Sequence, residues 1–235
     1  MKAFTSAIIK TRSPAKNSPC VVGTLHTLGG FAAASKLSNN QIDLIEIRLD
    51  QLPGFPTPAR LKNLHFPKLF TARTPQEGGE RNLSTNERRK LLLRALPWAS
   101  LIDIELRNFK PYHELRREAQ SARLPIIASY HNFSKCPPLS LLQEKLHQSR
   151  DEGAAIFKAA VQLHKSRDIA TLLELLEKAR DFPVAVMGMG NLGRASRLLL
   201  TAAGSCLVYG WLHRPQVPGQ FPAAILRERL KEVCG

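Results

Sequence analysis

Cysteine is scarce in this sequence of 235 residues, and its few copies lie far apart. No two of them form a CxxC pair, the spacing that many zinc and redox sites use. A disulfide framework is also unexpected in a chain whose cysteines are so scattered. We therefore expect reduced thiols at the four positions, which are Cys20, Cys136, Cys206 and Cys234.

Long apolar runs are missing as well. A helix that spans a bilayer needs about 20 apolar residues in a row. The nearest candidate, LLLRALPWASLIDIEL, is interrupted by Arg94, Pro97, Asp103 and Glu105. The start of the chain, MKAFTSAIIKTRSP, has no apolar core long enough for a signal peptide. The sequence thus predicts a cytoplasmic protein with no membrane partner.

Acidic and aromatic residues are few relative to basic ones. The chain has 34 Lys and Arg against 19 Asp and Glu, a net charge of +15, and only 6% aromatic residues. Such a charge suits nucleic acid or an anionic small molecule. A surface that stacks nucleic-acid bases needs aromatic side chains among its basic ones, and the sequence shows no such interleaving. We therefore expect no nucleic-acid partner, and keep a basic nucleic-acid-binding protein as the non-enzymatic alternative.

What the sequence does have is a regular alternation of short apolar runs with amphipathic segments. This pattern predicts parallel strands joined by crossover helices. One of the helices should begin with a capping box formed by Ser84 and Glu87. The expected strands cover residues 20–25, 42–49, 68–73, 100–106, 124–131, 154–161, 183–190 and 205–212.

Eight strand–helix units in a chain of this length favour a closed (β/α)8 barrel of the TIM type, in the α/β class, for which about 250 residues is typical. A doubly wound open sheet is the alternative. We expect residues 20–235 to form one catalytic barrel domain. Residues 1–19 lie outside the repeat, and we expect this N-terminal extension to cap the lower end of the barrel.

Polar side chains gather where the expected strands end, which is where barrels of this kind carry their chemistry. Arg48 and Arg73 are 25 residues apart, and His131 and Lys158 are 27 apart. Each step is about one strand–helix unit, so these side chains should recur at similar heights in the barrel mouth. The candidate site residues are Glu46, Arg48, Arg73, Glu77, His131, Lys158, Arg197, Gln216 and Gln220.

Two of the expected strands carry charged residues at alternate positions, Glu46 with Arg48 and Asp103 with Glu105. Alternate residues of a strand share one face, and charges that point into a barrel are costly to bury unless they pair or bind something. A structural ion pair would account for Glu46 and Arg48 alone, and snorkelling to solvent would account for Lys158. The convergence of a lysine, a histidine, acids and arginines at one end favours a functional site.

This set of side chains permits chemistry on a ketone. A desolvated lysine near other cations has a lowered pKa, so Lys158 would supply a neutral amine that forms a Schiff base. The protonated imine acidifies the neighbouring carbon, and His131 would move the proton as general base and acid. Glu77 would hold the imidazole in its tautomer, and Arg197 would bind a carboxylate. These residues indicate a lyase or an aldolase and leave the substrate open.

Seven short motifs, in order along nearly the whole chain, together resemble the type I 3-dehydroquinate dehydratases. The resemblance implies a (β/α)8 barrel, usually a homodimer, that converts 3-dehydroquinate to 3-dehydroshikimate and water by syn elimination in the shikimate pathway. It also implies that no metal and no separate cofactor are used. The motifs are EIRLD at 46–50, FTARTPQEGGE at 70–80, IDIEL at 102–106, SYHNF at 129–133, FKAAV at 157–161, MGMGNLGRASRL at 187–198 and VPGQ at 217–220.

The resemblance also implies a role for each candidate residue. Lys158 matches the lysine that forms the imine, His131 the base that takes the C2 proton and helps water leave, and Glu77 the acid that partners the histidine. The other matched positions bind substrate. Glu46, Arg48 and Arg73 match contacts to its hydroxyl groups, and Arg197 and Gln220 match contacts to its carboxylate.

The chain departs from the family pattern at two places. Gln216 stands where a substrate-binding serine is common, and its amide can still donate to a carboxylate. At the end of the first strand, where a serine often faces the site, the sequence offers Gly23. An alternative within the same chemistry is a class I aldolase-like barrel that acts on another keto acid.

Overall fold

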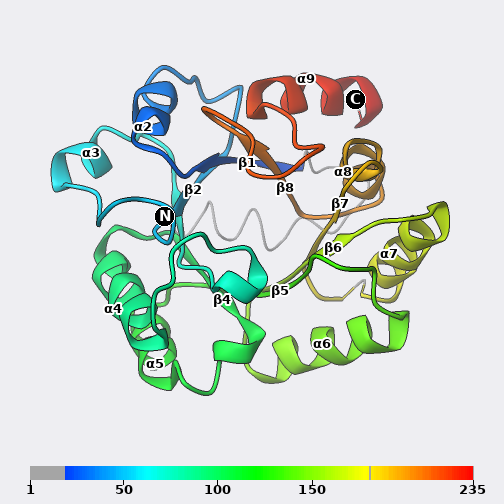
Figure 1. Cartoon of the computed structure of the whole chain (residues 1–235), viewed down its shortest axis with the longest axis horizontal. Coiled ribbons are helices and arrows are strands. Elements are labelled where there is room, and N and C mark those ends of the chain that lie inside the picture. The colour runs from blue at the N-terminus through cyan, green and yellow to red at the C-terminus, as the bar shows by residue number, and fades with distance from the viewer. Residues whose placement is uncertain (1–18, 180, 235) are drawn as a thin grey trace.

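The computed structural model describes residues 19–179 and 181–234, and within them eight parallel strands form a ring (Figure 1). Several strands are one or two residues shorter than expected at an end, and β5 and β6 each end one residue later than expected. Their bounds are β1 Cys20–Leu25, β2 Leu44–Arg48, β3 Lys68–Thr71, β4 Leu101–Glu105, β5 Ile126–Asn132, β6 Ile156–Gln162, β7 Val184–Met189 and β8 Leu207–Trp211.

The first and last strands are neighbours, since β1 pairs with both β2 and β8. The strand order is β7-β6-β5-β4-β3-β2-β1-β8, and the pairs are parallel. At the remaining seam, the amide of Cys206 donates to the carbonyl of Val184 at 2.9 Å, and the amide of Val186 donates to the Ser205 hydroxyl at 2.9 Å. These contacts between the two end strands close the ring, which confirms the predicted barrel and excludes the doubly wound sheet.

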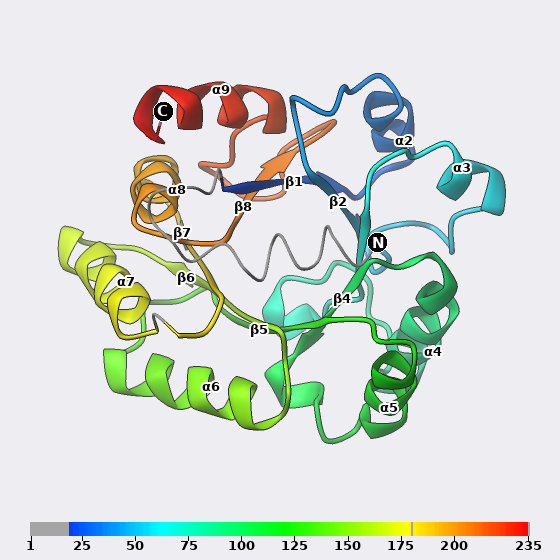
Figure 2. The same cartoon turned by 180° about the vertical axis from the view of Figure 1, so that it is seen from behind.

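Helices follow the strands and lie outside the ring, as the views from both ends show (Figures 1 and 2). Helix α4 begins with the expected capping box, in which Ser84 and Glu87 each accept from the other's backbone amide. Within the described residues, no helix is long and apolar enough to cross a membrane. The helices are α2 Leu28–Ala34, α3 Pro58–Lys62, α4 Thr85–Ala95, α5 His113–Ser121, α6 Leu139–Asp151, α7 Ser166–Lys178, α8 Gly193–Ala202 and α9 Ala223–Cys234, with short 3-10 turns η1 Pro75–Glu77, η2 Leu96–Trp98 and η3 Leu106–Asn108.

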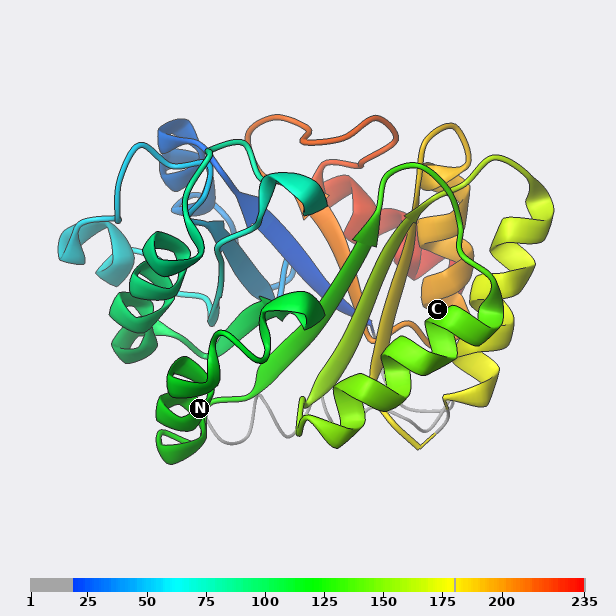
Figure 3. The same cartoon turned by 60° about the horizontal axis from the view of Figure 1, so that its bottom comes forward.

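The alternation of side chains along each strand divides the core into two layers. One set packs between strands and helices, for example Ile102 and Ile104 of β4. The other set fills the lower part of the barrel interior, for example Leu101 of β4 and Ile156 of β6. Above these apolar residues the inward-facing positions become polar, and the carboxyl ends of the tilted strands lie beneath the β8–α9 loop (Figure 3).

The expected N-terminal extension, residues 1–19, lies outside the described part of the chain except for Pro19. Its capping of the lower barrel end therefore stays a prediction.

Candidate active site

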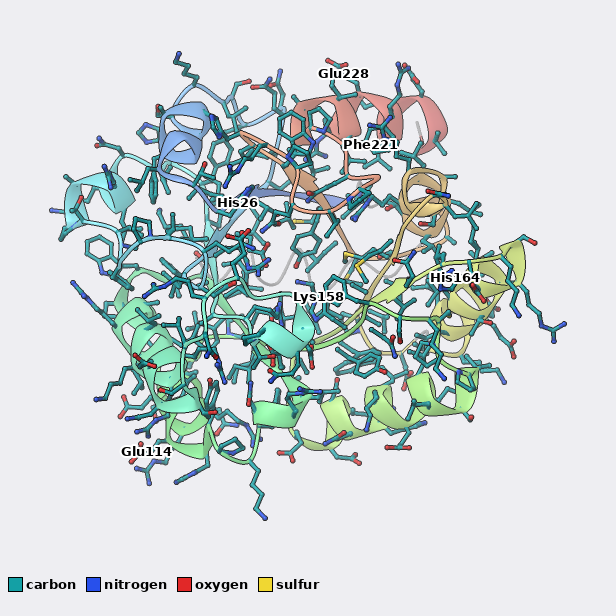
Figure 4. The ribbon with its side chains drawn as sticks, in the orientation of Figure 1. His26, Glu114, Lys158, His164, Phe221 and Glu228 are labelled. Atoms are coloured by element: carbon teal, nitrogen blue, oxygen red, sulfur yellow. The ribbon has the colours of Figure 1, made fainter. Side chains whose placement is uncertain are left out.

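The candidate residues converge on one cavity of about 250 Å³ at the carboxyl ends of the strands. Lys158 points into the middle of the ring (Figure 4). All nine candidate residues predicted from the sequence line this cavity, so they meet at one end of the barrel as expected. They are Glu46, Arg48, Arg73, Glu77, His131, Lys158, Arg197, Gln216 and Gln220.

Lys158 lies in a layer of interior side chains that come from the even-numbered strands. The interior of such barrels is filled by layers of this kind, each built from alternate strands. Its Nζ is 3.0 Å from Oδ2 of Asp103 on β4 and 3.6 Å from Oε1 of Glu46 on β2. The ring of Tyr209 on β8 lies beside it, with the centroid 4.2 Å from Nζ. Aliphatic residues commonly occupy such a layer, and here two carboxylates, a lysine and a tyrosine replace them. A buried cation is thus surrounded by groups that stabilise positive charge.

Asp103 is the most connected of these groups. Besides Lys158, it accepts from Nη2 of Arg73 at 2.9 Å and from the Ser129 hydroxyl at 2.5 Å. Burial alone would raise the pKa of Asp103, but Arg73 and Lys158 hold it well below its usual range. Asp103 is therefore an anion at neutral pH, and it lies beneath the cavity.

Glu46 is held by two hydroxyl donors from neighbouring strands. Thr71 of β3 donates to its Oε1 at 2.9 Å, and Thr24 of β1 donates to its Oε2 at 3.2 Å. Thr24 is also the residue of β1 that lines the cavity. Gly23 packs the other way, since a Cβ there would lie 2.6 Å from Leu212. The prediction that Gly23 takes the site-facing position was therefore wrong by one residue, because that face belongs to Thr24.

His131 and Glu77 form a direct pair at the end of β5. Nδ1 of His131 lies 2.9 Å from Oε2 of Glu77, and the backbone amide of His131 donates to the same oxygen at 3.1 Å. Burial and the nearby Glu105 raise the pKa of Glu77 to about 8. Burial, Arg73 and Lys158 lower the pKa of His131 well below its usual value. The histidine is thus held in its neutral form, and when Glu77 is ionised its second nitrogen is available for proton transfer.

Glu77 reaches this position through a tight turn. It ends η1, and the following Gly78 has φ of +88°, a conformation that favours glycine. The carbonyl of Gly78 accepts from Nη2 of Arg48 at 3.1 Å. Arg48 also donates to both carboxylate oxygens of Asp50, at 3.0 and 2.7 Å. The bidentate pair fixes Arg48 against the turn that carries Glu77.

Arg197 enters the site from α8, between β7 and β8. One of its terminal nitrogens, Nη1, donates to the carbonyl of Tyr209 at 3.3 Å and lies 3.8 Å from the sulfur of Met187. Its Nε is buried with no hydrogen-bond partner. Burial lowers the pKa of Arg197 to about 10. Among the described residues no carboxylate pairs with this guanidinium, which is the environment expected of a group that binds an anion.

The β8–α9 loop brings two glutamines over the cavity. Oε1 of Gln220 accepts from the backbone amide of Gln216 at 3.0 Å, and the side-chain amide of Gln216 donates to Gln51 at 2.8 Å. Gln216 therefore bridges the loop to the segment after β2. A contact of Gln216 or Gln220 with substrate stays a prediction.

Several residues of the site escaped prediction as functional. Asp103 and Tyr209 sit on expected strands, and the alternation of Asp103 with Glu105 was the one available signal. Ser129 lies in the SYHNF motif but was given no role, and no sequence pattern distinguishes Thr24 or Gln51. Among the residues that the structure describes, no group of three His, Cys, Asp or Glu side chains is placed to hold a metal ion.

A closed barrel of eight parallel strands, with convergent charged residues at the carboxyl ends of those strands, defines a (β/α)8-barrel enzyme. Comparison with known proteins names the family. Residues 20–233 match the model of the type I 3-dehydroquinase family, and the chain belongs to that family. Its enzymes are lyases of the shikimate pathway that act on 3-dehydroquinate. This membership decides against the aldolase-like alternative.

The relatives match over most of their length. The 3-dehydroquinate dehydratase of Methanocella arvoryzae is 34% identical over 193 residues, covering 80% of this chain and 86% of the relative. That of Methanothermobacter thermautotrophicus is 34% identical over 194 residues, covering 81% and 85%. The crystal structure of the Geobacillus kaustophilus 3-dehydroquinate dehydratase superposes with a TM-score of 0.83 at 27% identity, covering 92% of this chain and 91% of that one.

Proposed function

We propose that this enzyme dehydrates 3-dehydroquinate to 3-dehydroshikimate and water by syn elimination through an imine on Lys158. One observation carries the proposal: Lys158 and the His131–Glu77 pair line the same cavity from the adjacent strands β6 and β5. Lys158 is also the only lysine among the described residues that line this cavity. A buried amine beside a neutral histidine is the pair that imine-based proton transfer needs.

The substrate carboxylate is assigned to Arg197. Its guanidinium is buried without an acidic partner, so an incoming carboxylate would supply the missing charge. Gln220, and Gln216 on the same loop, add amide groups to the lining of the cavity. The substrate hydroxyl groups are assigned to Glu46, Arg48 and Arg73, which line the same cavity.

Imine formation begins when the Lys158 ammonium loses a proton. Glu46, 3.6 Å away, is the acceptor that we assign, because Asp103 has a strongly depressed pKa and is a poor base. The free amine adds to the C3 carbonyl carbon of the substrate to give a carbinolamine, whose hydroxyl takes the proton back from Glu46 and leaves as water, so that a protonated imine remains. Its positive charge takes the place of the ammonium between Asp103 and the Tyr209 ring.

His131 then moves one proton twice. It removes a proton from C2, and the electron pair of that C–H bond flows into the imine nitrogen to give an enamine. The enamine expels the C1 hydroxyl, which takes the proton from His131 and leaves as water. Because His131 acts on both the C2 proton and the C1 hydroxyl, these two groups must lie on the same face of the substrate ring, and the elimination is therefore syn. Water then hydrolyses the remaining imine, releasing 3-dehydroshikimate and restoring Lys158.

Two variants test this division of labour. His131→Ala should still form the imine but turn over about 10²- to 10⁴-fold more slowly, the usual contribution of general acid–base catalysis. Lys158→Met should neither form the imine nor turn over. Mass spectrometry of the intact protein mixed with 3-dehydroquinate measures the adduct, and a continuous assay of product measures turnover. A His131→Ala variant with full activity would remove this residue from the proton-transfer role.

A further inference from the structure

The two oxygens of the Glu77 carboxylate face different sides of the site. Oε2 accepts from the backbone amide and the ring of His131, at 3.1 and 2.9 Å. The other oxygen, Oε1, lies 3.2 Å from Nε of Arg107, in η3 just after β4. The side chain of Glu77 is 3% exposed, whereas that of Arg107 is 51% exposed. A cation at the protein surface thus reaches a buried carboxylate whose other oxygen holds the histidine.

The charges around Glu77 explain why this contact matters. Arg73, a second cation that lowers the pKa of Glu77, is already engaged by two carboxylates, at 2.9 Å by Asp103 and at 3.8 Å by Glu105. Burial, Glu105 and Asp103 all favour the protonated form of Glu77. The titratable and charged groups that face Glu77 come from three strands and a turn, and they are Arg73 after β3, Asp103 and Glu105 on β4, Arg107 in η3 and His131 on β5.

Arg107 differs from the other cations near Glu77 in its position. It does not line the cavity, so it acts on the reaction only through Glu77. We propose that Arg107 is a positioning residue that holds the Glu77 carboxylate against His131. This inference rests on the proposed function of the His131–Glu77 pair.

Removing the charge of Arg107 should change the pH at which the His131–Glu77 pair becomes active. When Glu77 is ionised, Nδ1 of His131 donates to it and the other ring nitrogen is a free base. When Glu77 is protonated, this arrangement is lost. Arg107 lowers the pKa of Glu77, so removing its charge raises that pKa and moves the onset of activity to higher pH. A half-exposed partner moves such a pKa modestly, by about half a pH unit.

The test uses Arg107→Gln, Arg107→Lys and a matched control, Lys110→Gln. Lys110 is an exposed cation in the same loop, so the control removes the same charge without touching Glu77. The first readout is the pH dependence of kcat/KM for 3-dehydroquinate. We expect the acidic limb to move up by about half a pH unit in Arg107→Gln, to be restored at least in part by Arg107→Lys, and to stay unchanged in Lys110→Gln.

The second readout needs no turnover. NMR titration of the His131 ring, assigned with His131→Ala, reports the apparent pKa of the coupled pair directly. An upward shift in Arg107→Gln but not in Lys110→Gln supports the proposal. Equal titration curves and pH profiles in the wild type and in Arg107→Gln would overturn it. Unchanged turnover in His131→Ala would show that the proposed function itself is wrong, whatever the NMR titration shows, and this outcome differs from failure of the inference about Arg107.

Discussion

Replacing Asp103 by asparagine should cost much of the stability of the barrel. Asp103 is buried and compensates two buried cations, Arg73 at 2.9 Å and Lys158 at 3.0 Å. Asparagine has nearly the same shape but no charge, so both cations would lose their closest carboxylate. Removing one partner of a buried ion pair costs about 3–5 kcal/mol, a large part of the roughly 5–15 kcal/mol that stabilises a typical domain.

Urea unfolding at pH 7 measures this cost. With a slope of about 2 kcal/mol per molar urea, Asp103→Asn should lower the unfolding midpoint by about 2 M. The matched control is Asp151→Asn, an exposed aspartate near the end of α6, which should change the midpoint little. If the free energy of unfolding of Asp103→Asn lies within about 1 kcal/mol of the wild-type value, the ion pairs of Asp103 do not stabilise the barrel as their distances indicate.

The wild type alone provides a second check of Asp103. Its pKa in the folded protein is depressed, so its contribution to stability is present above the unfolded-state pKa of about 3.9 and is lost as pH falls toward the folded-state pKa. The free energy of unfolding should therefore fall between about pH 4 and pH 2. If Asp103→Asn folds, this part of the decline should be reduced in it.

Three further results are expected. Arg197→Gln should raise KM for 3-dehydroquinate by roughly 10- to 100-fold with a smaller change in kcat, because it removes a charge-assisted contact to the carboxylate; an unchanged KM would place the carboxylate elsewhere. The wild-type kcat/KM should rise with pH as Glu77 ionises through its raised pKa of about 8, and a profile flat from pH 6 to 9 would contradict the role of the pair. Substrate carrying deuterium at C2 on the face of the C1 hydroxyl should lose the label, and retention would exclude syn elimination.

The fold was predictable from the sequence because each strand–helix unit carries its own local signals. Apolar runs such as Val184–Met189 are buried on both faces, and the capping box of Ser84 and Glu87 marks the start of α4. Strand ends were less certain, as with β2, which was expected over 42–49 and covers Leu44–Arg48. Those ends depend on where backbone pairing stops, which is set by neighbouring strands.

Nine of the residues that line the cavity were predictable, but the pairing among the residues of the site was not. Strand-end position places His131 and Lys158 at the same mouth without revealing which carboxylate each one meets. Asp103 is 55 residues from Lys158 in the chain, and their contact depends on the tilt of the strands around the barrel. Arg107 carries no periodic signal, because its contact with Glu77 depends on a short turn after β4.

The claim that Lys158 forms an imine with the substrate is tested most directly by chemical trapping. The protein is incubated with 3-dehydroquinate and borohydride, and the added mass is located by peptide mapping. We expect irreversible loss of activity and a single reduced adduct at Lys158, with no adduct in Lys158→Met. Dehydration that continues under borohydride without any adduct, or an adduct at another lysine, would contradict the account.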